Sequence, residues 1–245
     1  INGTLRNFLR KKNSFIREKV IFGDYPDWFC KNASNLTEKE KINFIHDINK
    51  QPSLHIVIKE KKYLKKYLKY GINTLENSIA IDSKYKFSDI PDFDKGEWWV
   101  QDFSSALPLN LISTPMCKKI ADVGSAPGGK LFQILSKNNN VTSYERNKNR
   151  ISRLNDNLVR LKFFKKIKIF DFLDENKSNK YDLIILDAPC SAIGTIRRHP
   201  EIFIKEKPNF QSLLNIQKKL MDKASSLLVK NGILIYMVCS FIEKE

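Results

Sequence analysis

The sequence predicts an α/β protein in which a smaller N-terminal α+β subdomain precedes a doubly wound, mainly parallel sheet. Three observations predict it. From residue 118 onward, short apolar runs typical of buried strands alternate with longer segments of helical periodicity. A glycine-rich turn follows the first of these runs, and two later runs end in the cysteine-containing segments DAPCS and VCS. Because such sheets bind ligands at the carboxyl ends of their strands, we expect a functional site at that edge.

The expected elements of the C-terminal half follow from this alternation. Strands are expected at 119–123, 141–144, 167–170, 183–186 and 233–238, and helices at 129–136, 147–162 and 210–229. A strand, a helix and a second strand in succession form a parallel unit, because a parallel pair needs a long crossover connection. The order therefore predicts an open sheet with helices on both faces.

The N-terminal half has shorter elements of mixed type. Helices are expected at 5–20, 28–33, 37–49 and 64–70, and strands at 54–59 and 79–81. Thr37 and Glu40 have the spacing of a capping box at the start of one helix. The composition changes after Pro91, so we expect a terminal helix at 1–25, a small α+β subdomain at 26–112 and the parallel-sheet domain at 113–245.

The net charge of +16 comes from 43 Lys and Arg residues against 27 Asp and Glu residues. A bound polyanion is one explanation, because each phosphate contact releases counterions. A Lys-, Ile- and Asn-rich composition typical of an AT-rich genome is another. The charge therefore supports a nucleic-acid partner without establishing it.

The four cysteines, at 30, 117, 190 and 239, show neither CxxC nor Cys/His metal spacing. We expect reduced thiols and no metal.

The sequence has no run of eighteen uncharged apolar residues and no signal-peptide pattern at its start. We therefore expect a cytoplasmic protein that does not bind membranes.

The turn at 122–130, DVGSAPGGK, is neither the dinucleotide GxGxxG nor the phosphate loop GxxxxGK[ST]. Paired glycines that open a helix let a ligand approach the backbone, and the free amides there favour a carboxylate. The amino-acid end of S-adenosylmethionine fits these features, although a tight strand-to-helix turn would give the same pattern.

Glu145 and Asp171 follow the next two expected strands, where they can meet the ribose hydroxyls and the adenine edge, or remain solvated acids.

The segments DVGSAPGGK, DAPCSAIGTIRRHPEI (187–202) and MVCSF (237–241) resemble the bacterial 16S ribosomal RNA cytosine-C5 methyltransferases of the RsmB (Sun/Fmu) family, of the NOL1/NOP2/sun type. WWVQDFSSALP (98–108) resembles the family segment that precedes the methyltransferase core. INGTLRNFLR (1–10) resembles the last helix of the family's NusB-like RNA-binding domain. The resemblance implies a Rossmann-like class I methyltransferase domain, truncated at its C-terminus, with S-adenosylmethionine as cofactor. It also implies RNA, 16S ribosomal RNA in particular, as partner of a monomer.

Cytosine C5 is too weak a nucleophile to attack a sulfonium methyl group, so a thiolate must first add to C6. The resemblance implies that Cys239 is this nucleophile, that Cys190 assists release of the enzyme from the methylated base, and that Asp187 binds the cytosine edge. DNA cytosine methyltransferases use a Pro-Cys nucleophile, which would instead assign that role to Cys190. Buried packing thiols are the plain alternative for each cysteine.

The remaining candidate residues fall into two groups. The cofactor-binding residues implied are Asp122, Gly124, Ser125, Ala126, Pro127, Gly128, Gly129, Lys130, Glu145, Arg150, Asp171 and Asp187. The RNA-contact residues implied are Arg197, Arg198 and His199, whose alternative role is to brace the loop. A tRNA or other RNA substrate, or an RNA-binding assembly factor on the same scaffold, stays open at this point.

Overall fold

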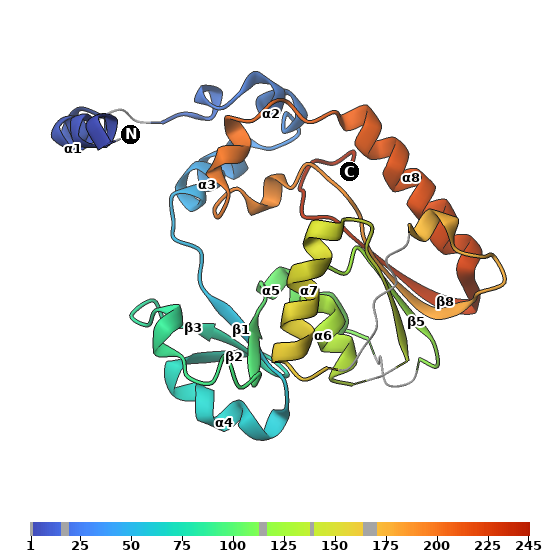
Figure 1. The fold of residues 1–245 in the computed structure, drawn as a ribbon. Helices are drawn as coiled ribbons and strands as arrows, with labels where there is room; N and C mark the ends of the chain where they lie inside the picture. Colours follow the sequence, from blue (N-terminus) through green and yellow to red (C-terminus); the bar gives the residue numbers. More distant parts are fainter. Residues whose placement is uncertain (1, 16–19, 113–116, 138–139, 164–170) are drawn as a thin grey trace. The chain divides into compact units, whose positions relative to one another are not determined.

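The computed structural model describes residues 2–15, 20–112, 117–137, 140–163 and 171–245 (Figure 1). The chain forms two compact units, each built from separate stretches of sequence. The smaller unit holds residues 1–51, 193–208 and 241–244, and the larger unit holds 52–192, 209–240 and 245. The polypeptide therefore passes from one unit to the other several times.

A parallel sheet, with four strands among the residues that the structure describes, forms the centre of the larger unit. Its strands, in spatial order, are β6 (Val141–Tyr144), β5 (Ile120–Val123), β7 (Tyr181–Asp187) and β8 (Leu228–Met237). Val123 pairs with Tyr144 on one side and Leu186 on the other, so the strands end at a common edge. The expected parallel sheet is confirmed, whereas the strand expected at 167–170 lies outside the described residues.

Helices cover both faces of this sheet, as Figure 1 shows. Alternate residues of β7 separate two cores. Leu183 and Ile185 pack with residues of α5 (Phe103–Asn110), α6 (Gly129–Leu135) and α7 (Lys148–Arg160). Ile184 and Leu186 pack with residues of α8 (Phe210–Leu227) on the other face. This period of two, with both faces buried, confirms the doubly wound arrangement.

The end of α8 and the start of β8 differ from the prediction. The helix ends at Leu227, and β8 begins at Leu228 instead of residue 233. Leu228 pairs with Tyr181, and the next pair is Ile233 with Leu183, so the register shifts across residues 229–232. These residues include the polar Lys-Asn-Gly sequence, which lies between the expected helix and the expected strand; in the structure they belong to β8 as an irregularity.

A second sheet, antiparallel and with four strands in the described part of the chain, also belongs to the larger unit. Its order is β2 (Gly71–Leu75), β3 (Ser78–Ile81), β1 (His55–Ile58) and β4 (Trp98–Val100). The expected strands at 54–59 and 79–81 correspond to β1 and β3. The expected helix at 64–70 is α4 (Leu64–Tyr67), extended by one 3₁₀ turn at Leu68–Tyr70 and preceded by another at Lys61–Tyr63. Buried Trp98 and Tyr67 lie in the core of this sheet.

The smaller unit contains α1 (Asn2–Phe15), α2 (Asp27–Asn32) and α3 (Glu38–Ile48). Thr37 and Glu40 form the predicted capping box. Val20, the expected last residue of the first helix, is not helical. The ring of Phe29 lies 5.2 Å from Phe44, 5.1 Å from Phe203 and 6.1 Å from Phe241, centroid to centroid. These aromatic contacts join the three stretches of sequence that make up the unit.

Within the described ranges, the helices are all too short or too polar to cross a membrane. Among the same residues, the His, Cys, Asp and Glu side chains form no group that could hold a metal ion.

Candidate active site

The two cysteine-containing segments leave the sheet side by side. Strands β7 and β8 stay paired up to Asp187 and Met237, and the Ala188 amide donates to the Met237 carbonyl at 3.0 Å. The loops that follow bring the Sγ atoms of Cys190 and Cys239 to 3.4 Å. The topology of a parallel sheet therefore places two thiols in contact at its carboxyl edge.

This contact makes the two thiols electrostatically unequal. A hydrogen bond from Cys190, opposed by burial and by Asp187, lowers the pKa of Cys239 to about 7. The same hydrogen bond, together with burial, raises the pKa of Cys190 above its ordinary range. Since the thiolate is the reactive form of cysteine, Cys239 is the member of the pair that is activated near neutral pH.

Asp187 and Lys130 form an ion pair beside the thiols. Lys130, in the first turn of α6, places its Nζ 2.7 Å from Asp187 Oδ2. Both side chains are mostly buried, with exposed fractions of 15% and 31%. Lys130 also helps to lower the pKa of Cys239. The sulfur atoms therefore lie near one positive and one negative charge that hold each other in place.

A cavity of about 350 Å³ extends from the two cysteines along the carboxyl edge of the sheet. This volume lies within the usual range for sites that bind small molecules. Its walls include Gly124, Tyr144, Glu145, Arg150, Asp171, Phe172, Asp187, Cys190 and Cys239. Five of the predicted cofactor-binding residues and all three predicted catalytic residues thus share one cavity.

The rest of the glycine turn lies behind the cavity wall and is connected to it through Glu145. The Glu145 carboxylate, only 4% exposed, accepts from the Ala126 amide at 3.3 Å and from the Asn147 amide at 3.0 Å. Arg150 pairs with Glu145 at 3.5 Å and donates to the Ala126 carbonyl. Ser125, Ala126, Pro127, Gly128, Gly129 and Lys130 do not line the cavity. Their position indicates a supporting role for the turn.

Val123 and Gly124 are the turn residues that line the cavity, and the backbone at Gly124 requires glycine. Its φ is +78°, and a Cβ atom there would lie 2.7 Å from the Asp187 carbonyl oxygen. The turn can therefore approach β7 closely because residue 124 has no side chain.

Asp122, the last predicted cofactor residue, is completely buried at the end of β5. Neither carboxyl oxygen has a hydrogen-bond partner among the residues that the structure describes. Burial raises the pKa of Asp122 to about 6. It lies outside the cavity lining, so its influence on a ligand there is through charge rather than direct contact.

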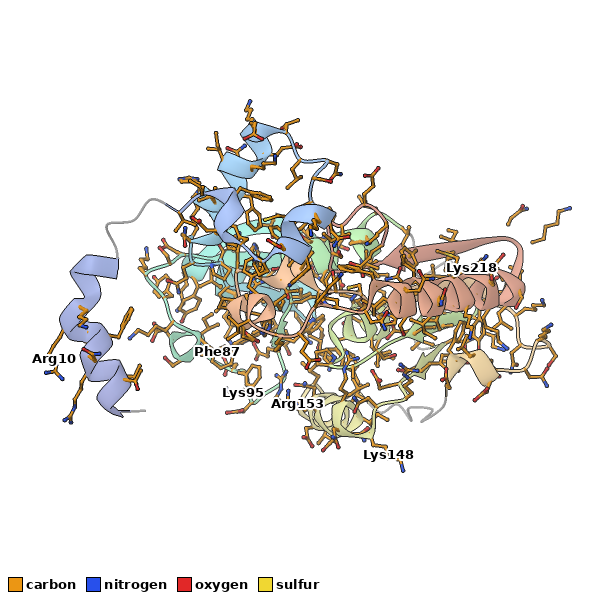
Figure 2. The ribbon with its side chains drawn as sticks, turned by 90° about the horizontal axis from the view of Figure 1, so that it is seen from above. Arg10, Phe87, Lys95, Lys148, Arg153 and Lys218 are labelled. Carbon is orange, nitrogen blue, oxygen red and sulfur yellow. The ribbon has the colours of Figure 1, made fainter. Side chains whose placement is uncertain are left out.

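The predicted RNA-contact residues lie in the smaller unit, and all three are exposed. The Arg197 guanidinium donates to the Lys50 and Gln51 carbonyl oxygens, at 3.4 Å each. His199 Nδ1 lies 3.2 Å from Glu201 Oε1. Arg197 and His199 thus have contacts within their own unit while their side chains remain accessible. Other basic side chains, such as Lys148 and Arg153 of α7 and Lys218 of α8, are also exposed (Figure 2).

Three residues beside the thiols were missed in the sequence: Ser191, Ser240 and Glu245. The Glu245 carboxylate contacts both serines, and each serine directly follows one of the paired cysteines. The repeated Cys-Ser dipeptide was a signal that could have identified the serines. Glu245 had no such signal, because its contact with Ser191 joins positions 54 residues apart.

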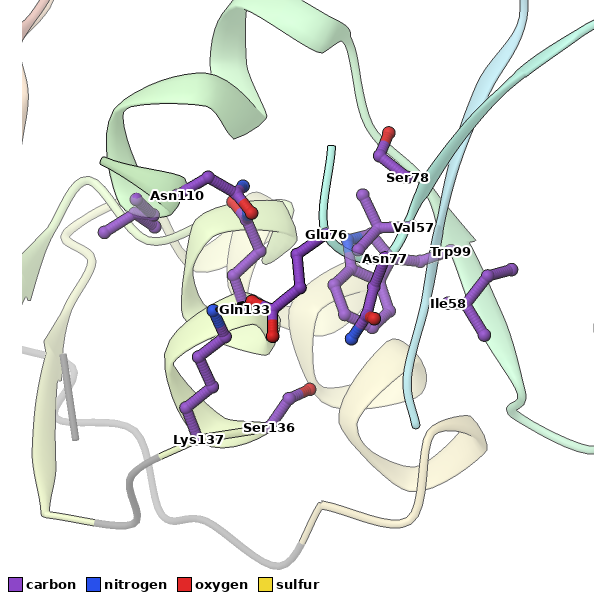
Figure 3. Close-up of a pocket in the computed structure, with 11 residues that line it drawn as sticks. Val57, Ile58, Glu76, Asn77, Ser78, Trp99, Asn110, Gln133, Ser136 and Lys137 are labelled. Atoms are coloured by element: carbon purple, nitrogen blue, oxygen red, sulfur yellow. Dashed lines mark hydrogen bonds and ion pairs between the residues drawn. The ribbon is translucent and has the colours of Figure 1, made fainter. Parts of the chain in front are cut away.

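A second, much smaller cavity lies between the antiparallel sheet and helices α5 and α6 (Figure 3). Its volume of about 20 Å³ is sufficient for about one water molecule. Trp99 and Gln133 are among its walls, and Lys137 pairs with Glu76 at its rim at 2.6 Å. This size excludes a nucleotide-sized ligand.

Residues 112–245, more than half of the chain, match the sequence model of the family described as 16S rRNA methyltransferase RsmB/F. Ribosomal RNA small subunit methyltransferase B of Photorhabdus laumondii is 30% identical over 264 aligned positions, which cover 100% of this chain and 62% of that protein. The protein of the same name from Proteus mirabilis is 29% identical, with 100% of this chain and 63% of that protein covered. The chain thus spans somewhat less than two thirds of the length of these relatives.

A solved structure, the methyltransferase homolog protein from Pyrococcus horikoshii, has the same fold. It superposes with a TM-score of 0.75 at 22% identity, covering 90% of this chain and 75% of that one. The Rossmann-like class I methyltransferase fold expected from the sequence is confirmed. On the family match, the chain belongs to the 16S rRNA methyltransferase RsmB/F family.

Proposed function

We propose that this protein transfers a methyl group from S-adenosylmethionine to C5 of a cytosine in 16S ribosomal RNA. The observation that carries the proposal is the pair of thiols 3.4 Å apart, beside Asp187 and at one end of the 350 Å³ cavity. Membership of the RsmB/F family supports the choice of substrate. A single activated thiol would serve many reactions, whereas two thiols beside a carboxylate suit a covalent adduct that must form and then break.

Cys239 is the proposed nucleophile. Its thiolate, available near neutral pH, adds to C6 of the cytosine and directs electron density to C5. Asp187 accepts hydrogen bonds from the amino edge of the base, and its ion pair with Lys130 fixes the orientation of its carboxylate. Bound S-adenosylmethionine supplies an electrophilic methyl group. Water takes the C5 proton, the bond between the Cys239 sulfur and C6 breaks, and Cys190, which stays protonated, assists this release by hydrogen bonding to the departing thiolate.

The cavity wall fits the proposed cofactor in its chemistry. Glu145 directly follows β6, where a carboxylate can accept both ribose hydroxyls, and Asp171 can accept the adenine amino group. The bare backbone at Gly124 allows close approach of the amino-acid portion. Asp122 contributes negative charge that favours an ammonium group nearby. The rest of the turn and Arg150 hold Glu145 in place.

The RNA is proposed to contact Arg197, Arg198 and His199, because guanidinium groups bind phosphates and stack on bases. Residues 26–112 are proposed as an RNA-binding subdomain, residues 1–25 as the end of a preceding RNA-binding domain, and residues 113–245 as the methyltransferase domain. The net charge of +16 supports RNA as partner. An rRNA substrate would place the activity in the cytoplasm, where we propose that the protein acts as a monomer.

Trapping on RNA that contains 5-fluorocytosine tests the mechanism, because fluorine at C5 cannot leave as a proton does and the adduct persists. We expect Cys239→Ala to abolish the covalent complex and Cys190→Ala to retain it. The opposite pattern would assign the nucleophile to Cys190. Absence of trapping with the unmodified protein, together with RNA binding but no uptake of S-adenosylmethionine, would instead indicate an RNA-binding factor.

A further inference from the structure

The two cysteine loops are joined beyond the end of the sheet by a second, polar contact. The Ala188 amide, just after β7, donates to the Met237 carbonyl at the end of β8. Past this point, Ser191 Oγ lies 3.1 Å from Ser240 Oγ, next along the chain from the paired thiols. The serines therefore form a contact parallel to that of the cysteines.

Glu245 holds this serine pair with a single carboxylate. Its Oε1 accepts from the Ser191 amide at 2.8 Å, and its Oε2 accepts from Ser191 Oγ at 2.5 Å and Ser240 Oγ at 2.6 Å. The Tyr236 hydroxyl, on β8, donates to the Glu245 backbone oxygen at 3.0 Å. Glu245 is thus anchored to the strand that leads to Cys239 while it binds the loop that carries Cys190.

The thiol contact alone is a weak constraint on the two loops, because S–H is a poor donor and sulfur a poor acceptor. Hydrogen bonds to a carboxylate are shorter and stronger than neutral ones. The three bonds to Glu245 are therefore charge-assisted contacts that hold the two loops together. The carboxylate acts on the sulfur atoms through the serines.

We propose that Glu245 is a positioning residue that sets the separation of the Cys190 and Cys239 sulfur atoms by binding the serine after each of them. The inference rests on the proposed function for its significance, since that function needs both thiols at one base. Its geometric content can be tested without RNA or cofactor.

The direct test uses the rate of disulfide formation as a measure of the separation between the two sulfur atoms. Diamide removes one hydrogen from each thiol and joins them, and peptide mass mapping identifies the Cys190–Cys239 bond. The rate of disulfide formation is divided by the rate at which iodoacetamide alkylates Cys239. This ratio corrects for differences in thiol reactivity. We expect Glu245→Ala to lower this ratio by about tenfold or more, since a lost charged hydrogen bond has at least that effect. Glu243→Ala is the matched control, because Glu243 bonds to Asn35 and belongs to the smaller unit. It should leave the ratio unchanged.

Two further variants separate positioning from charge and from loss of folding. Glu245→Asp keeps the charge but shortens the side chain, so we expect it to resemble Glu245→Ala. Ser240→Ala removes one of the three bonds and should lower the ratio less, at an unchanged melting temperature. If Ser240→Ala and Glu245→Ala both cross-link at the parent rate, the proposal is overturned. A Glu245→Asp protein that cross-links at the parent rate would also overturn it, because the negative charge alone would then be sufficient.

The same variants test whether the separation of the two sulfur atoms matters for the proposed catalysis. In trapping on 5-fluorocytosine RNA, Glu245→Ala should slow formation of the covalent complex about as much as it slows cross-linking, with unchanged affinity for S-adenosylmethionine. If the parent protein and its variants cross-link as expected but none of them traps RNA, the proposed function is wrong and the positioning role of Glu245 still holds. Trapping at the parent rate despite slow cross-linking would show that the spacing has no catalytic role.

Discussion

Cys190 and Cys239 are in sulfur–sulfur contact, although 49 positions separate them in the chain. The contact follows from the fold, because β7 and β8 are neighbours and each cysteine comes two or three residues after a paired strand end. Parallel strands align their carboxyl ends, so two motifs far apart in sequence meet without any long loop. This relationship makes one thiol the hydrogen-bond donor of the other.

The first prediction concerns the pH dependence of Cys239. Its lowered pKa means that the thiolate fraction, and with it the trapping rate, should rise as pH increases through about 7. Cys190→Ala removes the hydrogen bond that lowers this pKa, so the midpoint should move up toward the ordinary thiol value. Cys190→Ser keeps a hydroxyl donor and should move it less. Iodoacetamide alkylation rates across the pH range measure both shifts; identical midpoints in all three proteins would contradict the assignment.

The second prediction concerns Glu145 and the cofactor. Glu145→Ala removes the proposed ribose acceptor and the partner of the Ala126 amide, so affinity for S-adenosylmethionine should fall by about tenfold or more. Isothermal titration calorimetry measures the change. Lys148→Ala, at the exposed start of α7, serves as the control and should bind the cofactor normally. Equal affinity in the Glu145 variant would move the ribose site elsewhere.

The third prediction concerns Gly124. An alanine there must adopt a positive φ and place its Cβ against the Asp187 carbonyl, so Gly124→Ala should destabilise the fold by about 1–3 kcal/mol. Thermal unfolding gives the change. Gly3, in α1, has no atom within 4 Å of an added Cβ, and Gly3→Ala should leave stability the same or slightly higher. A Gly124→Ala protein as stable as the parent would mean that the turn relaxes away from β7.

The fourth prediction concerns RNA binding by Arg198. Arg198→Ala should weaken RNA binding and reduce the slope of affinity against salt concentration by about one phosphate contact, with cofactor affinity unchanged. Binding measured at several salt concentrations provides both quantities. Lys218→Ala tests whether any exposed cation has the same effect. If the two variants lose affinity equally, the contribution of Arg198 is general charge rather than a specific contact.

The sequence was sufficient for the parallel sheet because its strands are strongly apolar. The four residues from Leu183 to Leu186 are completely buried and could be recognised as a buried strand. Strand β2 was missed because it contains a glycine and two polar residues and its Ile72 is 76% exposed, so neither hydrophobicity nor alternation marks it. Strand β4 has only three residues, too few to show a period.

The position of the candidate site was predictable where its residues lie at or just after strand ends, as for Asp187, Cys190 and Cys239, which line one cavity. It was not predictable where a contact depends on the path of a loop. The bonds of Glu245 to Ser191 and Ser240 require the final coordinates of three segments. Likewise, the pattern of the glycine turn could not distinguish residues that line the cavity from residues that support it, because both need small side chains.

The buried carboxyl of Asp122 has a consequence for the protein without ligand. A carboxyl whose pKa is about 6 when folded and 3.8 when unfolded binds a proton more tightly in the folded chain. Folding is therefore progressively weakened as pH rises from about 4 to 6, by about 3 kcal/mol in all, and the deficit persists at neutrality. Replacement by asparagine should abolish this acid-favoured stability. A cation bound near Asp122 would offset this deficit, so ligand binding and the stability of the folded sheet would be linked through one carboxylate.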